Sequence, residues 1–308
     1  MKQKFPLLLL FLFIYSKIIF SQLTPGGIYS IGPNPPYTQP GGFPYTGNFT
    51  SLSAAVSQLN LSSASGHYIL EFQNDYTPAS ESFPVVITYV GAPTAVATIR
   101  PRSDVPISGI SVTGSVSGGP IVFLNGASYV HIDGRPGASG PFSTRRLTFQ
   151  NNAASLVSNI SIGFVAASYN RVAACTLKVN GGNVINLGAN GCSHNRIHSN
   201  YMSMATTTHP SIGVNSDGSL PLLNTDDTIS ANIIAYPTSM GINIGTNSTS
   251  FVVAENHVGG GLSLNMPANR NFYGIRVASG GGHKIFGNII GDDFSSSNAI
   301  YENINTSG

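Results

Sequence analysis

The sequence predicts an all-β solenoid, in which short strands stack coil upon coil, and three observations support this fold class. First, a short phrase with two apolar ends recurs at intervals typical of one solenoid turn. Second, only 8% of the 308 residues are charged, against about 25% in an average soluble domain, and glycine occupies 35 positions. Third, the chain contains one convincing amphipathic helix, just before the first strand-like segment.

The repeats from about residue 119 onward are the basis of the solenoid prediction. Each contains a strand of the form apolar-x-apolar, and successive strands start 23, 27, 30 and 33 residues apart. These strands are Ile162-Gly163-Phe164, Ile185-Asn186-Leu187, Ile212-Gly213-Val214, Ile242-Asn243-Ile244 and Ile275-Arg276-Val277. Stacked at about 4.8 Å per coil, their apolar side chains form a continuous column. An ordinary β-sandwich is the alternative, but it requires neither the fixed phrase nor the single helix.

A second phrase, apolar-x-x-Asn-x-apolar, follows each of these strands. Its asparagines are Asn200, Asn232, Asn256 and Asn288, and an earlier copy carries Cys175 at the same place. Asparagine tolerates the left-handed backbone of a tight bend, and its amide can bond to the asparagine of the next coil. We therefore expect a structural Asn ladder. A β-branched residue at Asn200 or Asn232 is expected to strain the bend by about 1–3 kcal/mol.

Residues 1–21 are typical of a secretory signal peptide. Lys2 and Lys4 precede an apolar run of nine residues, Leu7–Tyr15, and small residues follow up to a cleavage point after Ser21. The run is far shorter than the roughly 20 residues that span a bilayer. We therefore expect a secreted or cell-surface protein whose mature chain has no membrane span.

The charge balance disfavours a nucleic-acid partner. The chain has 14 basic and 12 acidic residues, a formal net charge of +2. Removing the leader removes Lys2, Lys4 and Lys17, which leaves 11 basic residues against 12 acidic ones, a net charge of −1. That charge is too small to hold a polyphosphate by counterion release.

The mature chain divides into three segments. Residues 22–47 are rich in Pro, Gly and Tyr, so they cannot be helical, and we expect a lead-in along the surface. Residues 48–62 predict a helix capped at Thr50, with an apolar stripe that would cover the first coil. Residues 63–308 predict the solenoid, which ends within what reads as a further coil, as in a truncated chain.

Three pieces of the chain carry a resemblance to a known family. They are the helix phrase FTSLSAAVSQLN, the block IVFLNGASYVHIDGRPG followed by RRLTFQN, and the repeated Ile-x-x-Asn-x-Ile. On these the chain resembles the right-handed parallel β-helix superfamily, the pectate-lyase-like fold, and in particular secreted Bacteroidetes-type surface proteins. The resemblance implies a single-stranded right-handed parallel β-helix with an N-terminal capping helix. Because this fold hosts lyases, hydrolases and non-catalytic adhesin-like stalks, it does not identify one activity.

Catalysis on this fold would need carboxylates that converge on one face. In the catalytic relatives that face is the outward side of the apolar-x-apolar strands, which here reads Gly163, Asn186, Gly213, Asn243 and Arg276. None of these residues is a carboxylate. The sequence therefore favours a non-catalytic scaffold that contacts polysaccharide or another surface protein; the alternative is a polysaccharide lyase or glycoside hydrolase.

The alternative function depends on three residues. Asp226, Asp227 and His283 resemble parts of the acidic and histidine motifs of polygalacturonase-type hydrolases. Asp217, Asp226 and Asp227 are likewise a runner-up calcium site, since carboxylate oxygens are calcium ligands. A solvated acidic bend is the favoured interpretation of all three aspartates.

A basic column is the candidate ligand-binding feature. Arg171 and Arg196 occupy equivalent places in successive coils, Thr228 follows, and Lys284 lies two coils further. Like charges one coil apart repel, so we expect a neutralising anion, either Asp227 or an acidic glycan.

Metal, cofactor and disulfide signals are weak. Cys175 and Cys192 fall on different sides of a coil, which favours two buried thiols over a disulfide. His194 and His198 lie in a bend and a strand, where they would not share a face. We expect no cofactor and no metal.

Overall fold

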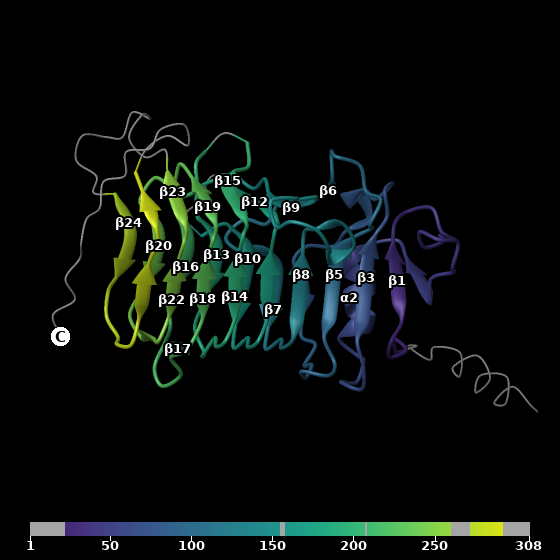
Figure 1. The fold of residues 1–308 in the computed structure, drawn as a ribbon, viewed down its shortest axis with the longest axis horizontal. Coiled ribbons are helices and arrows are strands. Elements are labelled where there is room, and N and C mark those ends of the chain that lie inside the picture. The colour runs from purple at the N-terminus through teal and green to yellow at the C-terminus, as the bar shows by residue number, and fades with distance from the viewer. Residues whose placement is uncertain (1–21, 155–157, 207, 260–271, 292–308) are drawn as a thin grey trace, which may run out of the picture.

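The computed structural model describes residues 22–154, 158–206, 208–259 and 272–291, so the predicted signal peptide at 1–21 lies outside the described residues. The described chain forms three long sheets of parallel strands that run side by side along the molecule (Figure 1). This arrangement confirms the all-β prediction and is consistent with a parallel β-helix solenoid.

Along the molecule the strands of each sheet follow one another in chain order, except that β2 lies outside β1 in the first sheet. The first sheet contains β2 (Gly47–Phe49), β1 (Ile28–Ile31), β3 (Tyr68–Phe72), β5 (Ala97–Pro101), β8 (Val130–Asp133), β11 (Arg171–Ala173), β14 (Arg196–His198), β18 (Thr228–Ser230), β22 (Val252–Ala254) and β25 (Lys284–Phe286). The second contains β4 (Val85–Ile87), β7 (Pro120–Asn125), β10 (Ile160–Val165), β13 (Asn183–Leu187), β16 (Ile212–Ser216), β20 (Met240–Ile244) and β24 (Tyr273–Val277). The third contains β6 (Ile110–Gly114), β9 (Leu147–Asn151), β12 (Thr176–Val179), β15 (Tyr201–Met204), β19 (Ile233–Ala235), β23 (His257–Gly259) and β26 (Ile289–Ile290). Two short strands, β17 (Asn224–Thr225) and β21 (Ser248–Thr249), pair with each other.

From β10 onward, each coil takes one strand from the second, first and third sheets in turn. Thus β10, β11 and β12 belong to one coil, and β13, β14 and β15 to the next. Val172 pairs with Ile197, which in turn pairs with Ile229, and all three side chains are fully buried. The stacked apolar columns that the repeats predicted are therefore present, and they form the core between the sheets.

The register of β16 differs from the prediction. Val214, not Ile212, pairs with Ile185, and Asn215, not Gly213, pairs with Asn186. Gly213 does not belong to the outward column: a Cβ added there would lie 2.5 Å from Ile234 Cγ2, inside the core. The apolar-x-apolar pattern misplaced the strand because Ser216, which is fully buried, stands where the neighbouring strands have Leu187 and Ile244.

The Asn ladder is confirmed. The Nδ2 of Asn200 donates to Oδ1 of Asn232 at 3.1 Å, and Asn232 and Asn256 donate in the same way to the next asparagine, each at 2.9 Å. Cys175 stands at the start, where its backbone N–H donates to Oδ1 of Asn200 at 2.9 Å. The ladder satisfies buried backbone donors as well as its own amides.

The expected reason for asparagine in the bend is wrong in one respect. The left-handed residue is the one before each asparagine, including Ser199 (φ 59°), Ala231 (φ 52°) and Glu255 (φ 57°). The asparagines are therefore not needed for the backbone turn. Their importance lies in the amide hydrogen bonds, so the cost of replacing one is a lost buried network and not a strained bend.

The helix α2 (Leu52–Leu59) is shorter than predicted, and Ser51 caps it instead of Thr50: the Ser51 side chain accepts from the Ala54 N–H. Leu52, Ala55, Val56 and Leu59 are its buried face, and it packs against β4, the outermost strand of the second sheet. Among the described residues no helix has the length and apolarity to cross a membrane.

The lead-in is more than a surface segment. Its residues 28–31 form β1, which pairs with β3, and Tyr29 and Ile31 are buried. Residues 47–49, at the start of the predicted helix, form β2 instead. Pro and Gly excluded a helix here, but they did not exclude short parallel strands at the end of the first sheet.

Candidate functional site

The outer face of the first sheet brings the predicted arginine column together. Arg171 pairs with Arg196 across β11 and β14, and His131 of β8 pairs with Arg171. Thr228 and then Val252 separate Arg196 from Lys284. Lys284 therefore lies in the same column, but three strands from Arg196.

Asp133 is the acidic partner in this face, and the sequence interpretation missed it. Its carboxylate is fully buried and pairs with Arg135 at 2.7 Å and Arg171 at 2.9 Å. Burial by itself would raise the pKa of the Asp133 carboxyl, but the hydrogen bonds from Arg135 and the charge of Arg171 hold that pKa below its usual range. The carboxylate is charged at neutral pH and offsets only part of the surrounding positive charge.

Two imidazoles complete the face. Burial, together with the charge of Arg171, lowers the pKa of His131 and of His198 to about 4 each. Both rings are therefore neutral at physiological pH and retain one N–H donor each. The sequence pattern argued only against a metal site at His198, whereas the structure places this residue in the candidate site.

The loop after β8 packs over one side of this face. The Arg135 guanidinium lies 4.0 Å from the centre of the Phe142 ring, and Phe142 meets His198 edge-on at 4.8 Å. Arg145 Nε donates to the carbonyl of Ser199 at 2.8 Å. The loop thereby holds Arg135 against Asp133 and leaves the Arg171–Arg196 side of the face more open.

We call Asp133, Arg135, His131, Arg171, Arg196 and His198 the basic site. Arg196 is exposed and makes no ion pair with any residue that the structure describes. The Nε of Arg171 is buried without a hydrogen-bond partner. Guanidinium groups bind carboxylate or sulfate through two parallel N–H donors, so this site can hold an anion.

Asp227 does not neutralise the basic column, contrary to the prediction. It is fully buried, and its Oδ1 accepts from the Asn195 backbone N–H at 2.7 Å and from Asn195 Nδ2 at 3.0 Å. Asn195 in turn accepts from Asn170 Nδ2 at 3.0 Å, which makes a second ladder that ends at Asp227. Desolvation raises the pKa of the Asp227 carboxyl to about 7.

The runner-up catalytic and calcium residues do not meet. Asp226 is exposed and lies 4.0 Å from His194, whereas its neighbour Asp227 is buried on the other side of the bend. His283 accepts from the Phe251 backbone N–H at 3.2 Å, and in the described part of the chain no hydrogen bond or ion pair joins it to either aspartate. Asp217 belongs to no group of three or more potential metal ligands among the described residues.

The corrected outward column of the second sheet contains amides and one cation. Asn215 Nδ2 donates to Asn186 Oδ1 at 2.8 Å, Asn243 Nδ2 to Asn215 Oδ1 at 2.7 Å, and Arg276 to Asn243 Oδ1 at 3.2 Å. The amides bond mainly to one another, and the column offers no proton acceptor of carboxylate strength.

Both cysteines are free thiols in the buried core, as predicted. Cys175 lies at the Asn-ladder bend, and Cys192 at the bend before the first sheet, where its N–H donates to Asn224 Oδ1 at 2.9 Å. Different bends of different coils hold them apart.

Comparison with protein-family models and with curated proteins finds no match for this chain. Any assignment of function therefore depends on the geometry of the basic site and on the resemblance of the sequence motifs.

Proposed function

We propose that the chain is a secreted, non-catalytic surface scaffold of the right-handed parallel β-helix superfamily that binds an acidic polysaccharide at the basic site. The observation that carries the proposal is the register of Arg171 and Arg196 on adjacent strands beside a single buried carboxylate, Asp133. Arg135 and Arg171 both pair with this carboxylate, and Arg196 makes no ion pair with any described residue, so the face stays positive and an external anion would balance it.

The fold supports a scaffold role. Three parallel sheets stack into a long body, and α2 packs at the outermost strand of the second sheet, where a capping helix would cover the open core. Export rests on the charged start and apolar run of residues 1–21. A sheet whose outer face repeats once per coil suits an extended polymer better than a compact ligand.

Recognition would depend on charge and on hydrogen bonding together. Arg171 and Arg196 project from neighbouring strands, which lie about 4.8 Å apart. Each can donate to a carboxylate or sulfate oxygen, and the neutral imidazoles of His131 and His198 can hydrogen-bond to hydroxyl groups. Attraction between exposed charges is screened by salt, so affinity should fall as ionic strength rises.

The lyase or hydrolase alternative finds less support. It relied on Asp226, Asp227 and His283, which do not share a site. A buried carboxyl such as that of Asp227 cannot reach a polysaccharide at the surface without a rearrangement of the bend.

Titration calorimetry on the purified chain tests the proposal. The probes are oligogalacturonate and sulfated dextran, with neutral dextran for comparison. We expect binding to both acidic probes. In the Arg171→Gln, Arg196→Gln double variant the affinity should fall at least tenfold, which corresponds to about 1.4 kcal/mol of binding free energy. Arg276→Gln, which removes one exposed arginine from the second sheet, is the control for a change away from the basic site and should bind as the wild type does.

Two results would contradict the proposal. One is unchanged affinity in the double variant when circular dichroism shows an intact fold. The other is turnover of oligogalacturonate, seen as absorbance of unsaturated uronic products, because a binding scaffold releases its ligand unaltered.

A further inference from the structure

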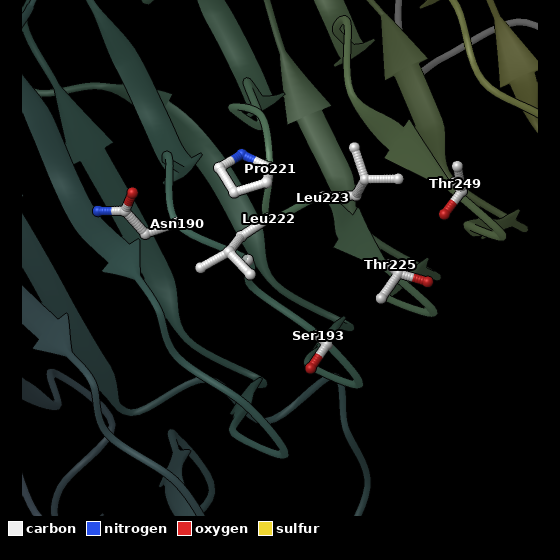
Figure 2. Close-up of a pocket in the computed structure, with 8 residues that line it drawn as sticks. Asn190, Ser193, Pro221, Leu222, Leu223, Thr225 and Thr249 are labelled. Atoms are coloured by element: carbon white, nitrogen blue, oxygen red, sulfur yellow. The ribbon is translucent and has the colours of Figure 1, made fainter.

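A hollow of about 330 Å³ lies where the second sheet turns toward the first, and none of its lining residues belongs to the basic site (Figure 2). Its polar side consists of hydroxyl groups from three successive coils. Ser193 pairs with Thr225 in an isolated parallel bridge, and Thr225 pairs with Thr249 across β17 and β21. The hydroxyls therefore recur once per coil, about 4.8 Å apart.

The opposite wall is apolar. The insertion that follows β16 contributes Pro221, Leu222 and Leu223, and Figure 2 shows them to the left of Thr225 and Thr249, with the Asn190 amide farther to the left. The Leu222 side chain is 55% exposed. A bridge between Ser219 and Leu222 and a hydrogen bond from the Asn190 N–H to Ser219 Oγ at 3.3 Å hold the insertion in place. An exposed apolar wall rimmed by polar groups is one form that ligand-binding grooves take.

Next to the hydroxyl row runs a stack of rings. Tyr129 and Tyr169 are parallel, with ring centres 5.0 Å apart, and Tyr169 stacks on His194 at 4.6 Å. All three adopt a left-handed backbone, with φ of 55°, 59° and 57°. Left-handed residues recur at the bends of the described coils, so the same bend geometry holds these three rings in register from coil to coil. Tyr169 remains 44% exposed, and it follows Ser168, which pairs with Ser193 of the hollow, so the ring stack adjoins the hydroxyl row.

We propose that the hollow binds one neutral sugar unit of a glycan strand that lies along the coils, with the next unit against the Tyr169 and His194 rings. The residues that line the hollow are all uncharged, and the neighbouring carboxylate of Asp226 accepts from Thr225 Oγ1 at 2.8 Å, which disfavours an anion. Hydroxyl and amide groups facing an apolar wall match a pyranose, whose rim carries hydroxyls and whose faces carry C–H groups. The volume lies at the lower end of the range for small-molecule sites, about 300–1,000 Å³. This site does not depend on the acidic-glycan proposal, because it shares no residue with the basic site.

The test uses the full chain and a panel of neutral oligosaccharides, namely cellohexaose, laminarihexaose, xylohexaose and mannohexaose. Binding is measured by calorimetry and, since the chain has no Trp, by tyrosine fluorescence. At least one probe should bind. Leu222→Ser and Thr249→Val, which remove the apolar wall and one hydroxyl, should each weaken that binding at least fivefold.

Two matched variants serve as controls. Leu220→Ser changes a leucine of the same insertion that is 74% exposed and does not line the hollow, so it should bind as the wild type does. The Arg171→Gln, Arg196→Gln double variant should also retain neutral-sugar binding. Asparagine tolerates the left-handed backbone, so Tyr169→Asn should keep the bend. This variant should weaken binding of the hexaoses but not of the monosaccharides from which they are built.

The inference is overturned if no probe of the panel binds at millimolar concentration. It is equally overturned if Leu222→Ser and Thr249→Val bind as tightly as Leu220→Ser. Loss of neutral binding in the arginine double variant would instead place the sugar at the basic site and exclude the hollow.

Discussion

Replacing Asp227 by Asn should stabilise the protein at neutral pH and remove part of its pH dependence. Asp227 ends the second ladder, and its Oδ2 is buried without a hydrogen-bond partner. In the coils before it, Asn170 and Asn195 each donate through Nδ2 to a backbone carbonyl of the preceding coil. That carbonyl belongs to the residue three positions before the ladder position of the preceding coil; for Asn195 it is the carbonyl of Ala167, at 2.8 Å. An asparagine at 227 would place its Nδ2 toward the equivalent carbonyl, that of Cys192.

The magnitude follows from the pKa of the Asp227 carboxyl, which burial raises from 3.8 to about 7. Between these values the native state keeps a proton that the unfolded chain has released. The stability gained from that proton is fully present below about pH 4 and is lost as the pH rises to about 7. At about 1.4 kcal/mol per pKa unit, the whole loss is about 4 kcal/mol.

Urea denaturation at pH 4.5, 6 and 8, followed by circular dichroism, measures this directly. The difference in free energy of unfolding between Asp227→Asn and wild type should grow with pH and level off above about pH 7, while contributions from the other carboxyls cancel. Asp226→Asn, at the exposed neighbouring position, is the control and should change stability by less than about 0.5 kcal/mol. A constant difference across the three pH values, or a variant that is less stable at pH 8, would refute the reasoning.

Three further predictions concern the bends and the thiols. Asn232→Ala should lower the free energy of unfolding by at least about 2 kcal/mol in urea titrations, because it leaves two buried donors of the preceding asparagine without an acceptor. Ala231→Gly should raise it by about 0.5–1 kcal/mol, since Ala231 has φ of 52°, whereas Ala254→Gly in the extended strand β22 should lower it. Cys175 and Cys192 should not react with Ellman's reagent in the native protein at pH 8 but should both react in urea, because burial raises both thiol pKa values, that of Cys192 to about 12.

Each of these predictions can fail clearly. An Asn232→Ala protein as stable as wild type would show that the amide network contributes little. A loss of stability in Ala231→Gly as large as that in Ala254→Gly would argue against strain at the left-handed position. One rapidly reacting thiol in the native state would place that cysteine at the surface.

The local sequence pattern was sufficient to predict the Asn ladder but not the basic site. Each ladder asparagine occupies a fixed place in a six-residue phrase, so its partner in the next coil could be inferred from the phrase alone. Asp133 and Arg171 are 38 positions apart and are separated by the loop that carries Phe142, whose length breaks the repeat. The signal was present in the quoted block HIDGR, but only the strand register shows that it faces the arginines.

The sequence by itself determined that apolar residues recur at coil intervals, and hence that the chain is built from stacked short strands, because that periodicity is local and each coil requires an apolar neighbour. It also determined the Asn ladder and the separation of the two cysteines. Only the tertiary structure decided on which side of a bend a polar group lies. Asp226 and Asp227 are adjacent, yet one is solvated and the other closes a buried ladder, since a left-handed residue at the bend reverses the simple alternation of a strand. The same effect, together with insertions of variable length, set the register that joins Asp133 to Arg171 and places Ser193, Thr225 and Thr249 in one row.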